Sequence, residues 1–86
     1  MTKKEQYQLA AKLLQIDLKK VEDYGGMIDD LSALYVSVPE KGGDSLIVGI
    51  DGGVLYANSS IGYSRHVEAF KKGNRTPLEA FERNEY

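Results

Sequence analysis

Hydrophobic residues in the first quarter of the chain recur at the spacing of an α-helix. One apolar stripe, at steps of three and four residues, comprises Tyr7, Ala11, Leu14, Leu18 and Val21. A second stripe, which lies on nearly the opposite side of a continuous helix, comprises Leu9, Leu13 and Ile16. The pattern therefore predicts helical structure over residues 3–24, ended by Gly25-Gly26.

This helical region has two interpretations. In the first, which we favour, one long helix, straight or kinked, is buried on two sides, by its own sheet and by a partner. In the second, the helix breaks near Ile16-Asp17 and Asp17 is the N-cap of a short second helix. A continuous helix cannot turn both stripes toward one sheet. We therefore expect the second stripe to serve self-association.

The middle of the chain is β-rich. Residues 33–38 form an apolar run that stops at Pro39, and a polar loop over 39–44 follows it. Two further β-rich runs flank Asp51-Gly52, a strong hairpin signal because both residues tolerate the positive φ of a two-residue type I′ loop. Residues 32–58 are predicted to form a three-stranded antiparallel meander.

The two-residue loop fixes a register for the second hairpin. Pairing Ile50 with Gly53 sets Val48 opposite Leu55 and Leu46 opposite Ala57, all on one face. The other face is also apolar, and its members are Tyr35, Ile47, Val54 and Tyr56. An exposed apolar patch of this kind marks a contact surface. A small second core under the C-terminal helices is the alternative.

Two short helices are predicted after the sheet. Ser64 is suited to be the N-cap of a helix through Lys72 that ends at Gly73. Thr76-Pro77-Leu78-Glu79 has the residues of a capping box at the start of another helix. The predicted fold is a single α+β domain over residues 1–86, with a long N-terminal helix, a three-stranded meander and two short C-terminal helices.

Composition limits the classes of protein that fit. The chain has 86 residues, no cysteine and a net charge of -2, so disulfides and thiolate chemistry are excluded and bulk attraction to nucleic acid or anionic membranes is weak. No apolar run is long enough to span a bilayer, and no signal peptide is recognised. We expect a cytoplasmic protein. Small acidic domains of this type are common among bacterial accessory and toxin-neutralising proteins.

Candidate chemistry is sparse. The single histidine, His66, lies near Ser64 in sequence, but its position in a first helical turn is poor for proton transfer, and a polar surface histidine is the expected role. The loop carboxylates have no metal-ligand spacing and are expected to serve turns and caps; they are Asp29, Asp30, Asp44 and Asp51. We expect no enzyme activity, no metal and no cofactor.

Two features favour binding. Residues 8–24 have the apolar spacing of a degenerate helix-turn-helix, although the would-be recognition stretch from Leu18 to Tyr24 is neutral. A basic group near the C-terminus suits an acidic partner surface or a phosphate, and it comprises Arg65, His66, Lys71, Lys72 and Arg75. A solvated helix end whose cations complement the helix dipole is the alternative.

The sequence therefore favours a small non-catalytic protein-interaction module. Leu9, Leu13 and Ile16 offer a second helix face for self-association. A nucleic-acid-binding regulator that uses residues 8–24 is the alternative. We expect a protein partner or a second copy, and no membrane.

Overall fold

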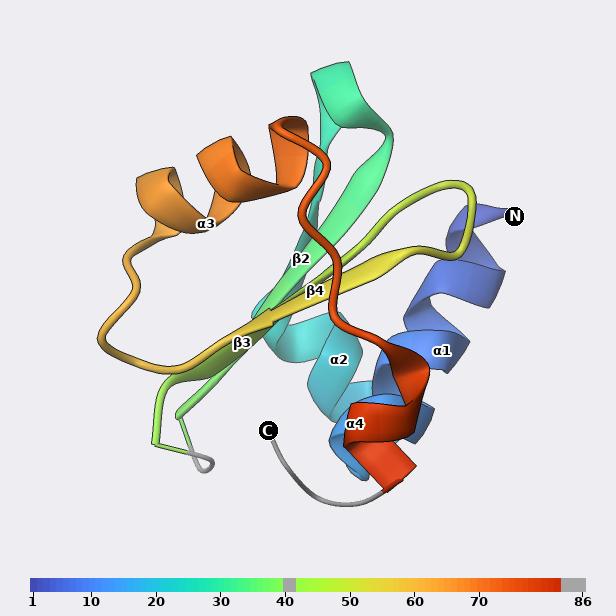
Figure 1. Cartoon of the computed structure of the whole chain (residues 1–86). Helices are drawn as coiled ribbons and strands as arrows, with labels where there is room; N and C mark the ends of the chain where they lie inside the picture. The colour runs from blue at the N-terminus through green and yellow to red at the C-terminus, as the bar shows by residue number, and fades with distance from the viewer. Residues whose placement is uncertain (40–41, 83–86) are drawn as a thin grey trace.

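The computed structural model describes residues 1–39 and 42–82, apart from the side chain of residue 82. It places helices on both faces of one antiparallel sheet (Figure 1). The elements in chain order are α1 (Lys3–Leu14), α2 (Leu18–Tyr24), β1 (Gly25–Ile28), the 3-10 turn η1 (Asp29–Leu31), β2 (Ala33–Val38), β3 (Asp44–Val48), β4 (Val54–Ala57), α3 (Tyr63–Lys71) and α4 (Leu78–Glu82). In the described part of the chain, no helix combines the length and apolar character needed to cross a membrane.

The N-terminal helical region consists of two helices. A capping box between Thr2 and Glu5 starts α1, and the helix ends where Gln15 adopts the left-handed conformation with φ 57°. Asp17 occupies the N-cap position of α2, but its side chain makes no cap hydrogen bond. The preference for one continuous helix is therefore wrong, and the alternative with a break before Asp17 is confirmed.

This break changes the role of the second apolar stripe. Leu9, Leu13 and Ile16 are half-buried and pack against the core that α1 and α2 form with the sheet. The turn at Gln15 redirects the chain, so that residues on two sides of the helical region reach the same core. The argument that these three residues need a second copy to cover them is therefore wrong.

The sheet has four strands in the order β1-β2-β3-β4, rather than the three predicted. The missed strand is β1, which pairs antiparallel with β2 from Gly25↔Val36 to Ile28↔Ala33. Glycine is depleted in strands, and Gly25-Gly26 resembles a helix stop. Pairing with β2 overrides that local preference. The remaining α+β architecture is as predicted, with an N-terminal helix, an antiparallel meander and two short C-terminal helices.

The β3–β4 hairpin has a loop one residue longer than predicted. Gly49 N–H donates to the Gly53 carbonyl at 2.8 Å, and Gly52 N–H donates to the Gly49 carbonyl at 3.1 Å. Ile50 and Asp51 therefore occupy the centre of a turn, and Gly52 follows with φ 88°. This is the three-residue loop in which a turn is followed by a left-handed residue.

The longer loop shifts the register by one residue. Val48 lies opposite Val54 and Ile47 lies opposite Leu55, so the predicted pairs of Val48 with Leu55 and of Leu46 with Ala57 are wrong. A shift of one residue turns every side chain of a strand to the other face. As a result, Val54 and Tyr56 face α1 and α2, whereas Leu55 faces α3.

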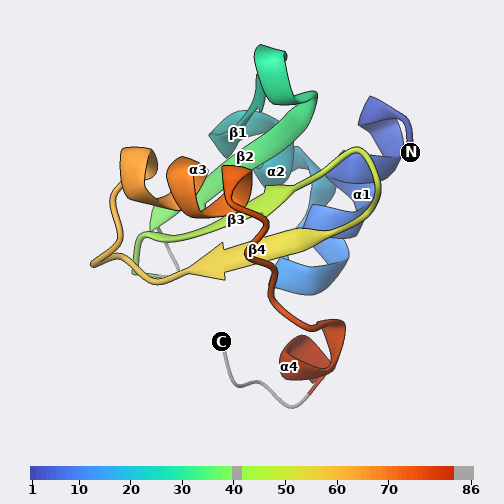
Figure 2. The same cartoon turned by 45° about the horizontal axis from the view of Figure 1, so that its top comes forward.

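Helices lie on both sides of the sheet (Figure 2), and each face of the sheet has its own hydrophobic core. The first core lies under α1 and α2 and also receives Phe81 of α4. The second core lies under α3, and its buried members are Ala33, Ile47, Val67 and Phe70. The alternative of a second small core under a C-terminal helix is therefore confirmed, and the helix is α3.

The C-terminal helices begin differently from their sequence signals. Gly62, not Ser64, is the N-cap of α3, and Gly73 with φ 96° follows its end as predicted. The Thr76 hydroxyl oxygen accepts the Tyr56 N–H at 2.9 Å, and Thr76 N–H donates to the Val54 carbonyl at 2.7 Å. The segment before α4 thus binds the outer edge of β4.

Candidate functional site

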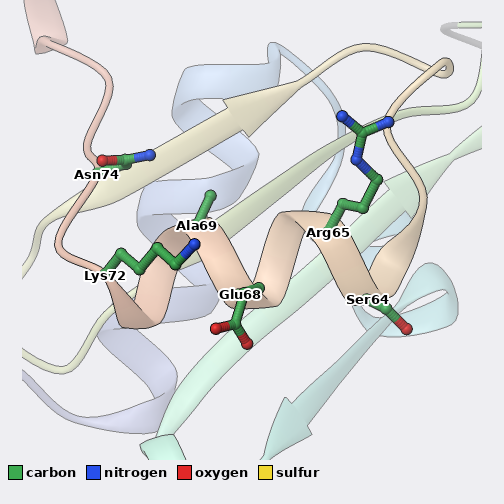
Figure 3. Close-up of a pocket in the computed structure, with 6 residues that line it drawn as sticks. All are labelled: Ser64, Arg65, Glu68, Ala69, Lys72 and Asn74. Atoms are coloured by element: carbon green, nitrogen blue, oxygen red, sulfur yellow. The ribbon is translucent and has the colours of Figure 1, made fainter.

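A hollow lined largely by polar residues lies on the outer side of α3. It has a volume of about 530 Å³, and its lining residues are Ser64, Arg65, Glu68, Ala69, Lys72 and Asn74 (Figure 3). The lining side chains face solvent because α3 is amphipathic. His66, Val67 and Phe70 are buried against the sheet, so the positions between them face solvent.

The charges of this hollow are only partly compensated. Arg65, Glu68 and Lys72 are all exposed, and no ion pair joins any of them within the described part of the chain, where Lys19–Asp23 at 3.7 Å is the salt bridge found. Figure 3 shows the Glu68 carboxylate pointing away from the side on which the Lys72 amine and the Asn74 amide lie. Seven positions of helix separate Arg65 from Lys72, which is a rise of about 10 Å. The hollow therefore presents two cationic groups at its two ends.

Arg75 has a structural position instead. Its guanidinium lies 3.6 Å from the centroid of the Phe70 ring, and its Nη1 donates to the carbonyls of Phe70 at 2.9 Å and Asn74 at 2.7 Å. These contacts satisfy carbonyls near the end of α3 and cover the second core. The predicted basic group is thus divided. Arg65, Lys71 and Lys72 are exposed on or beside the hollow, and Arg75 is tied to the helix end.

His66 is buried rather than exposed, which corrects the expectation of a surface histidine. Its side chain is 1% exposed, and its Nε2 lies 2.8 Å from the Leu55 carbonyl while Nδ1 lies 3.0 Å from Ser45 Oγ. A carbonyl only accepts, so Nε2 carries the hydrogen. Burial lowers the pKa of His66, which leaves the ring neutral at pH 7, so the Ser45 hydroxyl donates to Nδ1.

This serine–histidine pair has the contact of a nucleophile and its base, but its surroundings do not suit catalysis. Ser45 is 1% exposed, so its hydroxyl is sealed from any substrate. The group that orients the imidazole is the Leu55 carbonyl, where a hydrolytic triad has a carboxylate. The pair instead satisfies two polar side chains inside the second core. Sequence reasoning paired His66 with nearby Ser64 and missed Ser45, which is 21 positions away.

The predicted aromatic patch does not exist as one surface. Tyr35 and Ile47 face α3, where Tyr35 makes edge contacts with the rings of Tyr63 at 4.7 Å and His66 at 5.7 Å. Val54 and Tyr56 face the opposite side, where the Tyr56 ring meets Phe81 at 6.3 Å and its hydroxyl donates to Asp44. Ile47 is 0% and Val54 is 1% exposed. The register shift separates these residues, so the prediction of one exposed apolar patch is wrong.

The region of the predicted helix-turn-helix contains two helices and a turn, but its second helix is not a basic recognition helix. The residues between α1 and α2 form a short turn, and Val21 of α2 is buried. Lys19 on the exposed side pairs with Asp23, so α2 offers little net positive charge.

A polar side chain of α1 that the sequence did not single out holds this helix to the sheet. The Gln6 side chain is buried and its Nε2 donates to the carbonyls of Ser32 at 2.8 Å and Val48 at 3.0 Å.

The acidic residues are separated in space. The Asp51 carboxylate accepts the Gly53 N–H at 2.9 Å within the hairpin loop, Asp44 accepts from Tyr56, and Asp29 and Asp30 lie exposed in η1. Among the described residues, no group of three or more histidine, aspartate or glutamate side chains could hold a metal ion. Turn chemistry explains Asp51, as predicted from the sequence.

The outer face of α3 is therefore the described surface on which sequence-predicted site residues remain exposed together. Comparisons with models of protein families, with curated proteins and with solved structures find no match for this chain.

Proposed function

We propose that this protein is a non-catalytic protein-interaction module that binds an acidic partner surface through the outer face of α3. The observation that supports the proposal is the placement of Arg65 and Lys72 at the two ends of one hollow, without an ion pair in the described structure. Lys71 adds a third exposed cation beside it. We call these three residues the α3 cationic surface.

The chain is acidic overall, with a net charge of -2, so a surface with three lysine or arginine side chains and one glutamate is a local feature. Charges on the rim of an interface act mainly on the rate of encounter and on specificity. An acidic partner with carboxylates about 10 Å apart, as at two positions seven residues apart on a helix, matches the spacing of Arg65 and Lys72 along α3.

Nucleic acid is the second candidate, because α1 and α2 are consecutive helices joined by a short turn, and helix-turn-helix regulators also have two helices joined in this way. The neutral surface of α2 counts against it, since phosphate contacts supply most of the affinity of nucleic-acid binders. The two candidates differ in the ligand that the protein binds and in the helix that binds it.

Two defined probes test the proposal. The first is a helical peptide with glutamates seven positions apart, compared with a version in which glutamine replaces them. The second is a duplex DNA of mixed sequence. We expect the acidic peptide to shift the amide NMR signals of α3, to bind less well as salt increases, and to bind better than either the glutamine peptide or DNA.

The decisive variant carries Arg65→Glu and Lys72→Glu. Its matched control carries Lys4→Glu and Lys12→Glu, which makes the same change of charge on exposed positions of α1. We expect the first variant to lose binding of the acidic peptide and the control to bind it as the wild type does. Equal loss in both variants would show that only net charge matters and would contradict an α3 site. DNA binding that maps to α2 would favour the second candidate.

A further inference from the structure

A second hollow, which is largely apolar, adjoins the polar hollow of α3. It has a volume of about 300 Å³ and lies between α3, the end of β4 and the loop that joins them. The apolar residues that line it are Leu55, Ala57, Ile61 and Ala69, and we call it the apolar hollow. Ala69 also lines the polar hollow, so the two hollows meet at this residue. A ligand that spans both would contact cations and apolar side chains together.

The packing of the fold does not explain Ile61 in the wall of the apolar hollow. Its side chain is half-buried, but it packs against neither of the two cores of the described structure. The turn before α3 fixes its position, because Ile61 N–H donates to the Asn58 carbonyl at 3.1 Å and the Asn58 side chain accepts the Ser60 N–H at 3.0 Å. Apolar surface left in water costs free energy, and a bound apolar group would cover it. The apolar hollow therefore favours an apolar group of a ligand.

Ala69 lies in the middle of a row that has a cation at each end. Arg65, Ala69 and Lys72 occupy positions i, i+4 and i+7, which share one side of a helix. Figure 3 shows Arg65 and Ala69 on the side of α3 along which β4 runs, and Glu68 on the opposite side. The side chains at the contact set how closely two helices approach, and alanine is small. The row therefore admits a partner helix laid along α3.

The charges of this row select the kind of helix. Arg65 and Lys72 lie on either side of Ala69, and neither forms an ion pair in the described structure. Glu68, the acidic residue that lines the polar hollow, points away from the side on which Ala69 lies (Figure 3). A partner helix with glutamate, an apolar residue and glutamate at positions i, i+4 and i+7 has the complementary row. When its carboxylates reach the two cations, its apolar side chain lies over Ala69 beside the apolar hollow.

We infer that the partner of α3 is an acidic helix with one leucine-like side chain between two carboxylates, and that this side chain enters the apolar hollow against Ala69 and Ile61. The inference rests on the proposed function, because it assigns the chemistry of the partner that the α3 cationic surface binds. The carboxylates act mainly on the rate of encounter. The buried apolar side chain acts mainly on the lifetime of the complex.

Three blocked peptides test this inference, each a helix built otherwise of alanine and glutamine. The first has glutamates at positions i and i+7 and leucine at i+4. The second has glutamine in place of the leucine, and the third has glutamine in place of both glutamates. Leucine and glutamine have similar helix propensities, so the first two peptides differ in their contacts rather than in their helicity.

The leucine should add affinity that salt does not screen. We expect the first peptide to bind about tenfold more tightly than the second, which corresponds to partial burial of one leucine side chain. The first should also bind more tightly than the third. Rising salt should weaken both acidic peptides and leave the ratio of their affinities unchanged, because salt screens the charges and not the apolar contact.

A pair of matched variants locates the apolar contact. Ile61→Thr makes the wall of the apolar hollow more polar and keeps a β-branched side chain. Ile50→Thr makes the same change at a residue of the β3–β4 loop that is 54% exposed. We expect Ile61→Thr to bind the first two peptides equally and to keep the wild-type affinity for the second. Ile50→Thr should retain the preference for leucine.

The wild-type protein supplies a second measurement if Ile61→Thr does not fold. Isotope-edited NMR should show contacts between the leucine methyl groups of the first peptide and the methyl groups of Ile61 and Ala69. Equal binding of the first two peptides, with both lost in the double variant of Arg65→Glu and Lys72→Glu, overturns this inference and leaves the proposed function standing. Failure of both acidic peptides to bind overturns the two together. Contacts of the leucine elsewhere on the protein, or equal binding of the third peptide, also overturn the inference.

Discussion

The two faces of the sheet are covered in contrasting ways. The first face is covered by α1 and α2 and has an apolar centre. The polar Gln6 side chain bonds there to the carbonyl just before β2 and to the last carbonyl of β3. The second face is covered by α3, with Leu31 of η1 packed beside it, and has few buried apolar residues. Polar and aromatic groups complete it, including the Ser45–His66 pair and the Arg75 guanidinium over Phe70.

This contrast shows how a short helix can cover a sheet face. Nine residues of helix, as in α3, offer only a few positions toward the sheet. A buried polar pair is acceptable there because both of its partners are satisfied, whereas an unpaired group would cost free energy. The first face should therefore carry most of the stability, and the second should depend more on pH and on single hydrogen bonds.

The largest effect is expected from Leu14→Ala on the first face. Leu14 is fully buried, and removing its side chain leaves a cavity, which costs about 2–5 kcal/mol of the free energy of unfolding. The matched change on the second face, Ile47→Ala, removes an equally large side chain that is also fully buried. Urea unfolding of both variants measures the difference. Equal losses would contradict the view that the first face dominates.

Ser45→Ala tests the polar pair on the second face. The substitution leaves the buried Nδ1 of His66 without its donor, which is expected to cost about 1–3 kcal/mol of the free energy of unfolding. Thermal unfolding measures the loss, and Ser64→Ala on the exposed side of α3 is the control. If the two variants melt together, the bond to Ser45 does not stabilise the second core.

Gly52→Val tests the β3–β4 loop, whose length sets which face of the sheet each β4 side chain occupies. Gly52 has φ 88°, which a β-branched residue rarely adopts, so strain of about 1–3 kcal/mol is expected. The amide NMR signals of the β3–β4 hairpin should shift more than those of the other strands. A variant as stable as the wild type would contradict the left-handed conformation at this position.

The pH dependence of stability between pH 7 and pH 5 should come from the second face, because the other lowered pKa, that of Glu5 in the capping box of α1, acts at lower pH. Burial lowers the pKa of His66 in the folded state, so below the ordinary value of 6.5 the unfolded chain binds a proton more readily than the folded one. Stability is then complete above that value and is lost as pH falls through it toward the folded pKa. Chemical denaturation at several pH values measures this, and in His66→Gln the loss between pH 7 and pH 5 should shrink.

The smallest effect on stability is expected from the double variant of Arg65→Glu and Lys72→Glu. Both side chains are exposed and make no ion pair in the described structure, so the free energy of unfolding should change by less than about 0.5 kcal/mol. Denaturant unfolding beside the binding assay separates the two properties. A large loss of stability would show that these cations support the fold rather than a partner.

Local signals along the chain predicted much of the architecture. The amphipathic stripes indicated the N-terminal helical region, and the β-rich runs indicated β2, β3 and β4. The helix start near Tyr63 and the stop at Gly73 were within two residues of their predicted places. These features are set by residues a few positions apart, through their backbone preferences and the spacing of their apolar side chains. Both can be read directly from the sequence.

The candidate site was predicted less completely. The exposure of Arg65, Lys71 and Lys72 agrees with a basic group on a helix surface. The burial of His66 and the engagement of Arg75 were not predictable, because Ser45, Leu55 and Phe70 contact them only after the sheet and α3 have packed. The patch that included Tyr35 and Tyr56 failed for a related reason, since one residue in a hairpin loop decides which face each side chain occupies.

The sequence by itself determined the α+β class and the apolar residues available for burial. Only the tertiary structure decided where the first helical region breaks, that Gly25–Ile28 pairs as a fourth strand, and which face of the sheet each β4 side chain meets. The physical reason is that alternatives such as a continuous or a broken helix, and a loop of two or three residues, differ little in local free energy. Burying both faces of one sheet at once selects between them.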